Sequence, residues 1–306
     1  MIPEIPPGMA AALSALSEVF KTVLSDLYKN NPYLYFNYDN IIFHYTSSDI
    51  LPCILSSDGI KLRFTDYRFL NDISEGNDFH ELFKLILNQL HECKSINDDF
   101  FNEANNQYKE LKPPQLFIAC FSMNKDSLPL WNYYLKNGKY EGYSLGFDFT
   151  TLKDDKNISV AKVIYDDETK EKVIKNIITK QNARDDIDIK IKCAELMDDI
   201  QKMHLFMKRN CFRHEEEIRL VLNRFAVDDN PSDKYRCGNI EYYNRNGILQ
   251  PFCDVTFNDT SIFKSCCFAP TMQKELAVIG LNSFLKSEKY DLSRISIFQS
   301  EIPVRY

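Results

Sequence analysis

The sequence predicts an α+β fold in which helices are inserted between strands. Two observations support this prediction. Short apolar or alternating runs, typical of strands, are separated by longer segments with apolar residues at helical spacing, and their order is not a regular βαβ repeat. The 306 residues include only nine glycines and contain neither a G-x-G-x-x-G nor a G-x-x-x-x-G-K pattern. Neither a Rossmann dinucleotide loop nor a phosphate-binding P-loop is therefore predicted.

The first 38 residues (1–38) are predicted to form a helical extension. An amphipathic helix is expected at about residues 10–29, and Asn30-Asn31-Pro32 ends it. Its polar face carries few cations. We therefore expect its apolar stripe to pack on the body or on a partner rather than on a membrane.

The body, residues 39–306, is predicted to contain both strands and helices. Helical spacing predicts helices at 50–56, at 76–93 and within a helical insertion at about 168–210, with a break near 183–185. The aromatic segment 130–134 joins two strands. Strands are expected at 41–45, 61–64, 115–122, 143–149, 160–165, 217–223, 253–257, 265–268, 277–279 and 295–300.

Composition and charge argue against several classes of protein. The formal net charge is −7 and the basic residues are spread along the chain, so a strong footprint for duplex nucleic acid is missing. No apolar run approaches the roughly 20 residues that a bilayer requires, and no association with a membrane is expected. Nine scattered cysteines without a C-x-x-C pair suggest a reducing, cytoplasmic location. None of the five histidines is spaced i, i+4, and no metal site is predicted.

The acidic cluster Glu215-Glu216-Glu217 is followed by Ile218-Arg219 and further apolar residues. As a strand, it would project Glu215, Glu217 and Arg219 from one face, with the two carboxylates about 7 Å apart. Such crowding is usually avoided unless a ligand or an arginine uses it. The alternative is a solvated sheet edge on which Arg219 neutralises one carboxylate.

Several short motifs occur along the chain in one order. They are His44-Tyr45-Thr46, Phe69-Leu70-Asn71-Asp72, Cys120-Phe121-Ser122, residues 131–134, residues 142–148, and Glu215-x-Glu217-x-Arg219. With these motifs the chain resembles, over about residues 40–306, the bacterial family known as domain of unknown function 2971. Departures are Ile218, where an aromatic residue is frequent in the family, and the N-terminal helix.

The opening and closing motifs are in turn similar to those of the ADP-ribosyltransferase fold, a split β-sandwich in which an early histidine, a mid-chain tyrosine and a late glutamate surround NAD. This resemblance implies an NAD-dependent ADP-ribosyltransferase or NAD glycohydrolase with inserted helices. It implies NAD as the substrate and a macromolecular acceptor, which is protein, DNA or RNA. A toxin or an anti-phage defence effector would suit such an activity.

The resemblance also implies roles for residues. Glu217 would orient the ribose 2′-hydroxyl and stabilise the oxocarbenium-like state, while Glu215 would take a proton from the nucleophile. The implied catalytic set is Glu217, Glu215, His44 and Tyr134. The residues implied to bind NAD through its ribose, nicotinamide or pyrophosphate are His44, Tyr45, Thr46, Arg63, Tyr133, Tyr134 and Arg219.

A second hypothesis is a non-catalytic module that senses a ligand or nucleic acid. In that case His44 would be a core histidine satisfied by a backbone carbonyl, and Glu217 would be structural. Trp131 is predicted to lie in the core under either hypothesis, and Cys120, in an apolar strand, is expected to be inert. The enzyme hypothesis requires His44, one of Tyr133 and Tyr134, and Glu217 to converge on one cleft.

Overall fold

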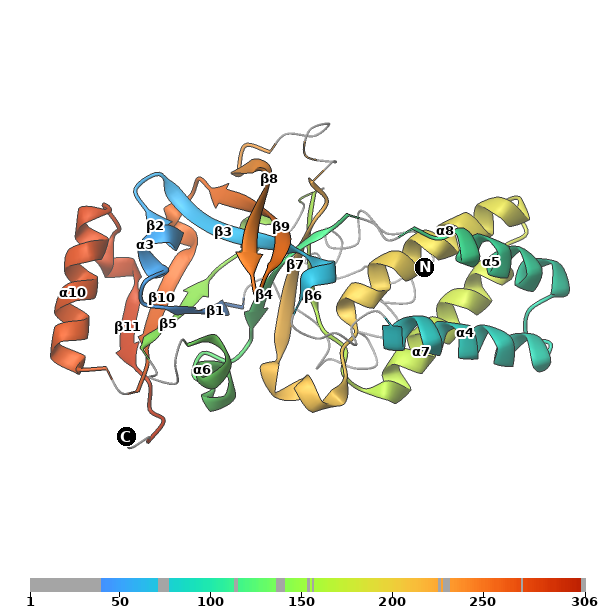
Figure 1. Ribbon diagram of the computed structural model, residues 1–306, viewed down its shortest axis with the longest axis horizontal. Helices are drawn as coiled ribbons and strands as arrows, with labels where there is room; N and C mark the ends of the chain where they lie inside the picture. Colours follow the sequence, from blue (N-terminus) through green and yellow to red (C-terminus); the bar gives the residue numbers. More distant parts are fainter. Residues whose placement is uncertain are drawn as a thin grey trace, which may run out of the picture.

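The computed structural model describes residues 40–70, 77–112, 115–135, 141–152, 155, 157–224, 227, 232–270 and 272–303. The predicted N-terminal helix and the Asn71-Asp72 pair lie outside the described residues. Within the described part, the protein is a mixed α+β structure built on one large sheet with a group of helices beside it (Figure 1).

The described part of the sheet contains 11 strands in the order β11-β10-β5-β1-β4-β3-β9-β8, with β2 paired to β3 and the pair β7–β6 joined to β4. Its ladders are antiparallel except for that between β10 and β11. The strands are β1 (Ile42–Ser47), β2 (Leu55–Ser56), β3 (Gly59–Asp66), β4 (Phe117–Ser122), β5 (Gly142–Phe147), β6 (Ile158–Lys162), β7 (Glu217–Leu222), β8 (Tyr235–Arg245), β9 (Ile248–Phe257), β10 (Phe263–Phe268) and β11 (Ser296–Gln299).

The sheet divides at β4. One edge of β4 pairs with β7 along its whole length, from Phe117↔Leu222 to Ser122↔Glu217. The other edge is shared, because β3 pairs with the first residues of β4 and β1 meets the last one, at Phe43↔Ser122. The two arms of the sheet therefore diverge from β4, and the end of β4 lies between β1 and β7.

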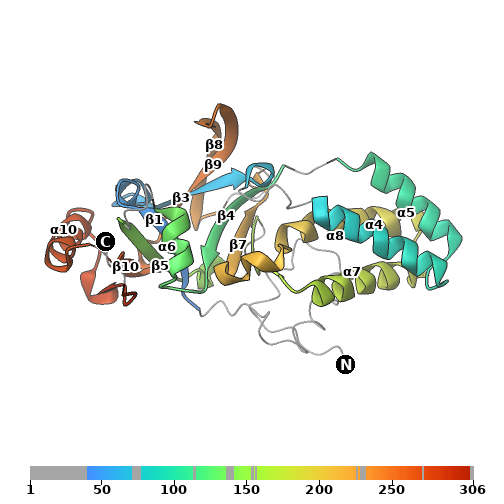
Figure 2. The ribbon, with the colours of Figure 1, turned by 60° about the horizontal axis from the view of Figure 1, so that its bottom comes forward.

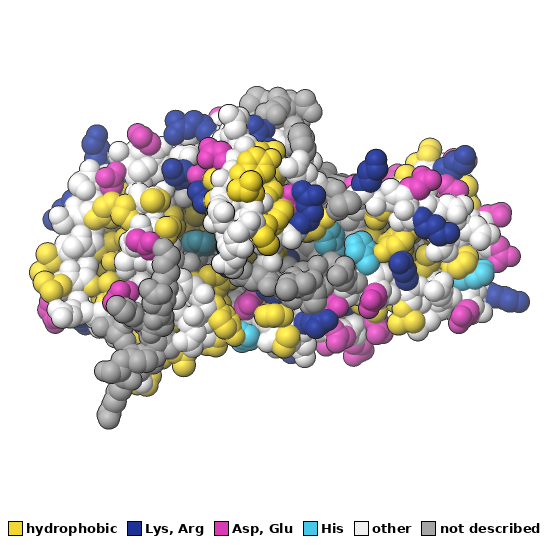
Figure 3. Space-filling view, in the orientation of Figure 1, with side chains coloured by type: hydrophobic (Ala, Val, Ile, Leu, Met, Phe, Trp, Pro, Cys, Tyr) yellow, Lys and Arg dark blue, Asp and Glu magenta, His cyan; other side chains and the backbone are white. Residues whose placement is uncertain are grey.

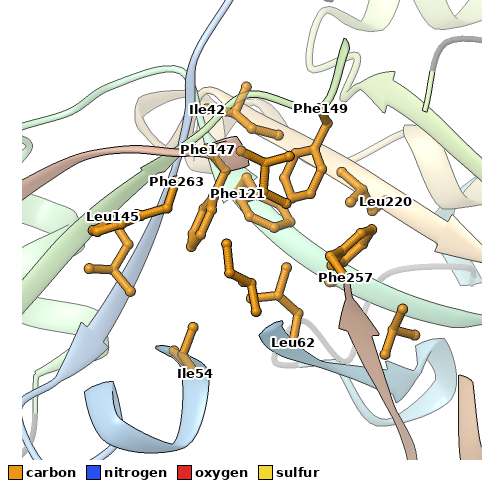
Figure 4. Packing of buried hydrophobic residues seen from close by; sticks show 14 of the residues in the cluster. Ile42, Ile54, Leu62, Phe121, Leu145, Phe147, Phe149, Leu220, Phe257 and Phe263 are labelled. Atoms are coloured by element: carbon orange, nitrogen blue, oxygen red, sulfur yellow. The ribbon is translucent and has the colours of Figure 1, made fainter. Parts of the chain in front are cut away.

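Apolar side chains from both arms pack against each other in the main core (Figure 4). Phe121 of β4 makes edge-on contacts with Phe147 and Phe149, at ring separations of 6.2 and 5.4 Å. The ring of Phe149 lies 5.2 Å from that of Phe257 on β9. These buried rings come from segments far apart in the sequence, so their packing holds the divided sheet in one arrangement.

Four helices form a separate group with its own apolar core, on the right in Figure 1. They are α4 (Asn77–Glu92), α5 (Asp98–Glu110), α7 (Asp167–Asn182) and α8 (Ile189–Met203). Side-chain caps explain where two of these helices begin. At the start of α5 the Asn97 side chain accepts a hydrogen bond from the backbone N–H of Phe100, and at the start of α7 the Asp166 side chain accepts one from that of Thr169. The helices α7 and α8 lie where the sequence predicts a helical insertion.

Three further helices flank the sheet: α3 (Leu51–Ile54), α6 (Leu128–Tyr134) and α10 (Lys274–Ser287). None of the described helices is both long enough and apolar enough to cross a bilayer. Residues 277–279, predicted as a strand, lie in α10. The prediction was wrong because Ala277 and Val278 are half-buried at helical spacing from Leu281 and Leu285, which α10 buries, whereas Ile279 is exposed.

The sequence pattern predicts the second half of β9 as the strand 253–257, but it misses β8 and the turn of the β8–β9 hairpin. Its turn contains Asn246 and Gly247, both with positive φ, and an Asn-Gly pair is a typical signal for a two-residue hairpin turn. The flanking residues of β8 are mostly polar and exposed, so the alternation that marks a half-buried strand is weak. Figure 2 shows the hairpin standing out from the body of the molecule.

Candidate functional site

A pocket of about 290 Å³, including its open mouth, lies where β1, β4, β7 and α6 meet. The register places Phe43, Ser122 and Glu217 side by side across three strands. Neighbouring strands are about 4.8 Å apart, so residues from about 170 positions apart in the sequence come within reach of one ligand. The pocket is lined by Phe43, His44, Tyr45, Cys120, Phe121, Ser122, Leu130, Tyr134, Glu215 and Glu217.

His44 is held by the neighbouring strand. Its Nδ1 atom lies 3.1 Å from the backbone oxygen of Cys120, and its ring lies 5.5 Å from that of Phe121. Burial lowers the pKa of His44, although the hydrogen bond to Cys120 opposes this effect. Because a carbonyl can only accept, Nδ1 carries the proton of the neutral ring, and Nε2 is left as an acceptor for a ligand hydroxyl.

Tyr45 supports the loop before α6. Its hydroxyl donates to the backbone oxygen of Asn124 and accepts from the backbone N–H of Ser127, both at 2.9 Å. Its ring packs edge-on against Trp131, which is fully buried, as a core residue is expected to be. Thr46 is buried and is not among the residues that line the pocket. The second residue of the His-Tyr-Thr motif therefore supports the pocket's structure, and the third lies outside the pocket.

The two tyrosines at the end of α6 occupy different places. Tyr134 is 39% exposed and lines the pocket, whereas Tyr133 is 60% exposed and its ring lies 5.6 Å from that of His214. Burial of its hydroxyl raises the pKa of Tyr134, and the neighbouring Cys120, Glu217 and Glu215 raise it further. The helix therefore presents Tyr134, and not Tyr133, to a ligand in the pocket.

Four charged side chains, Lys208, Glu215, Glu217 and Arg219, form a buried ion cluster beside the pocket. The Lys208 Nζ lies 2.7 Å from Glu215 Oε2 and 3.2 Å from Glu217 Oε2. Arg219 donates from Nε to Glu217 Oε1 at 2.9 Å and from Nη2 to Glu217 Oε2 at 3.1 Å. Two carboxylates and two cations balance in charge, which is the usual condition for burying such groups.

The cluster gives its two carboxyl groups opposite properties. Burial raises the pKa of Glu217, but the charges of Arg219 and Lys208 outweigh burial and hold it at about 2. Burial raises the pKa of Glu215 above its ordinary value, and Lys208 only partly opposes this. Burial and the nearby Glu217 also raise the pKa of Cys120, so this residue stays a protonated thiol. One group is thus a permanent anion and the other is suited to exchanging a proton.

The strand β7 begins at Glu217, as the predicted range 217–223 has it, so Glu215 lies outside the strand and does not share a strand face with Glu217. Glu215 ends a 3-10 helix, Asn210–Glu215, and Glu216 adopts a left-handed conformation with φ of 44° before β7 starts at Glu217. The two carboxylates still meet, but through Lys208 and not through strand alternation. Lys208 was missed because nothing in the sequence links a lysine after α8 to the acidic cluster.

Arg63, implied to bind NAD, lies on β3 away from the residues that line the pocket. It pairs with Asp254 at 3.1 Å, and its guanidinium stands 3.7 Å over the ring of Phe252. Arg219 binds Glu217 but does not itself line the pocket, and its Nη1 donates to the backbone oxygen of Leu205 at 2.6 Å. The structure thus brings together His44, Tyr45, Tyr134, Glu215 and Glu217. It leaves Arg63, Thr46, Tyr133 and Arg219 outside the pocket lining. In the described part of the chain, no group of three or more His, Cys, Asp and Glu residues is arranged to hold a metal ion.

Because the pKa of Glu217 is lowered, we expect the folded state to lose stability at acidic pH. Its folded value of about 2 lies below its ordinary value of 4.5, so the contribution is complete above pH 4.5 and is lost as the pH falls towards 2. Glu215 partly offsets this loss of stability, because its raised pKa makes the folded state more stable at low pH. We expect the urea midpoint to fall between pH 5 and pH 3, and to fall less in Glu217→Gln. An equal fall in both proteins would contradict the assignment.

Residues 130–220 match the family model described as "Protein of unknown function (DUF2971)". This stretch contains most of α6, all of α7 and α8, and the ion cluster, and the match supports the resemblance to that family. No curated protein and no solved structure matches the chain.

Proposed function

We propose that the pocket between β1, β4, β7 and α6 binds the nicotinamide end of NAD, and that the protein is an NAD-dependent ADP-ribosyltransferase or an NAD glycohydrolase. The observation that carries the proposal is the convergence of His44, Tyr134 and Glu217 on one pocket. The division of the sheet at β4 supports it too, since a split β-sandwich is the fold that the family resemblance implies.

The reaction would break the bond between nicotinamide and C1′ of the ribose, and the nucleophile would then bond to C1′. Positive charge develops on the ribose in an oxocarbenium-like state, as in glycoside cleavage. Glu217, which is ionised at neutral pH, would stabilise that charge. Glu215, with its raised pKa, would accept the proton that water or the acceptor loses.

The carboxylate of Glu217 has limited room for a substrate hydroxyl. It accepts from Arg219 Nε, Arg219 Nη2 and Lys208 Nζ, and a carboxylate offers about four acceptor sites. The remaining site lies near the thiol of Cys120, a weak donor that a ribose hydroxyl would replace. His44 Nε2 is the second acceptor available to the ribose.

The enclosed part of the pocket is small, about 20 Å³, which is room for a group the size of one water molecule. The nicotinamide end of NAD would therefore bind in the open mouth of the pocket, and the rest of NAD would lie outside it. The flat face of Tyr134 suits the electron-poor nicotinamide ring.

A non-catalytic sensing module is the second candidate. It is favoured by the engagement of Glu217 with two cations and of His44 Nδ1 with a backbone carbonyl. In this role the same side chains would hold the three strands together, and the pocket would bind a ligand without changing it.

Incubation of the purified protein with NAD separates these candidates. Release of nicotinamide by the protein alone would identify a hydrolase. Release that requires cell lysate, with ADP-ribose label on protein, DNA or RNA, would identify a transferase and its acceptor. Binding of NAD without release would favour the sensing module, and neither binding nor release would overturn the proposal.

The adjacent tyrosines of α6 provide a matched pair of variants. We expect Tyr134→Ala to raise the KM for NAD about 5- to 150-fold, because stacking on an aromatic ring contributes about 1–3 kcal/mol. Tyr133→Ala, which removes an exposed ring, is expected to change the KM for NAD by less than about twofold. The KM and the melting temperature of both variants should be measured, and equal effects on KM would count against Tyr134 as the stacking residue.

A further inference from the structure

Two cysteines lie in contact at the base of the β8–β9 hairpin. The Sγ atoms of Cys237 and Cys253 are 3.1 Å apart. The register shifts between Cys237 and Ile240, so a bulge at Gly238 and Asn239 brings the thiol of β8 towards that of β9. The Cys253 thiol also lies 3.2 Å from the backbone oxygen of Gly238. Closing the pair to a disulfide length of about 2.05 Å requires a movement of about 1 Å.

The two thiols differ in access. Cys237 is partly exposed on the last strand of the sheet, whereas Cys253 is fully buried. The hydrogen bond with Cys237, together with burial, raises the pKa of Cys253. An oxidant from solvent would therefore reach Cys237 first, and Cys253 is placed to respond as the second thiol.

We propose that Cys237 and Cys253 form a reversible disulfide when a hydroperoxide oxidises the protein. In the first step the Cys237 sulfur takes an oxygen atom from the hydroperoxide, giving a sulfenic acid and an alcohol, or water when the oxidant is hydrogen peroxide. In the second step the Cys253 sulfur attacks the Cys237 sulfur and the hydroxyl leaves as water with the proton of Cys253. Two thiols are thus oxidised, one hydroperoxide is reduced, and a cellular dithiol would reverse the reaction.

The bond would link the outermost strand of the sheet to its neighbour. Within the described sheet β8 pairs with β9 alone, and residues 248–251 of β9, between the turn and Phe252, are not paired with β3. The free end of the hairpin exposes Tyr242, Ile248 and Leu249, and hydrophobic side chains gather over it in Figure 3. A disulfide at the base would restrict how this exposed end moves relative to the body.

Peptide mapping tests the proposal directly. Trypsin cuts after Arg236, Arg245 and Lys264, so Cys237 and Cys253 fall on separate peptides, 237–245 and 246–264, with one cysteine each. The full chain is treated with increasing hydrogen peroxide, its remaining thiols are alkylated, and it is digested without reductant. We expect a linked pair of these peptides in the monomer, which dithiothreitol separates and which Cys237→Ser abolishes.

Cys93 supplies the internal control. Its thiol is exposed, and a hydrogen bond with Ser95 lowers its pKa, so its oxidation reports that the oxidant was sufficient. The linked peptides should persist in Cys93→Ser. If Cys93 of the unmodified chain is oxidised while Cys237 and Cys253 are not linked, the proposal is wrong. A link found only in a covalent dimer would also overturn it.

Discussion

Replacing Glu217 with glutamine is expected to lower nicotinamide release by about 10²–10³-fold, the range seen when one electrostatic contact to a developing charge is removed. Glutamine has nearly the same shape and can still accept a hydrogen bond, but it carries no charge. The oxocarbenium-like state would lose its nearest anion while the pocket walls stay in place. The measurement is the rate of nicotinamide release at saturating NAD.

Glu216 provides the matched control for this substitution. It is the adjacent residue, it is exposed, and it lies outside the ion cluster. Glu216→Gln should therefore keep its activity, and both variants should be assayed below their melting temperatures because Glu217→Gln leaves two buried cations facing one carboxylate. An unchanged rate in Glu217→Gln would remove Glu217 from the chemistry and support the sensing module.

Replacing Arg219 with methionine is expected to destabilise the protein by about 3–5 kcal/mol, the cost of removing one partner from a buried ion pair. Arg219 is 1% exposed and Glu217 is 4% exposed. Without Arg219, the Glu217 carboxylate keeps only Lys208, and the backbone oxygen of Leu205 loses its donor. Urea unfolding followed by circular dichroism measures the loss.

Replacement of an exposed arginine provides the comparison for the stability loss in Arg219→Met. Arg294 pairs with Asp291 on the surface at 3.2 Å, and Arg294→Met should cost about 1 kcal/mol or less. The double variant Glu217→Gln/Arg219→Met should recover part of the stability lost in Arg219→Met, because it no longer buries an unpaired charge. If Arg219→Met and Arg294→Met lose equal stability, the ion cluster does not contribute as proposed.

The site could be predicted only in part. His44, Tyr134 and Glu217 were found from motifs because each is a chemically distinctive residue in a short local pattern. Lys208 could not be found, because it lies in an unremarkable segment and acquires its role only when the chain after α8 returns to β7. Arg63 was assigned to the pocket because arginines suit pyrophosphate, yet on β3 it is directed to Asp254 and Phe252. Residue type indicates what a side chain can do, but it does not locate that side chain.

The sequence by itself determined the mixed α+β class, the helical segments α4, α7 and α8 and most strands, since these follow from short-range periodicity and capping. It failed where local signals conflict or are weak, as in residues 277–279 and the polar strand β8. Only the tertiary structure decided which edge of β4 each strand joins, which tyrosine of α6 faces the pocket, and how Glu215 meets Glu217. Those outcomes depend on packing between segments far apart in the chain, such as Phe121 against Phe149 and Lys208 against both glutamates, and no local pattern encodes them.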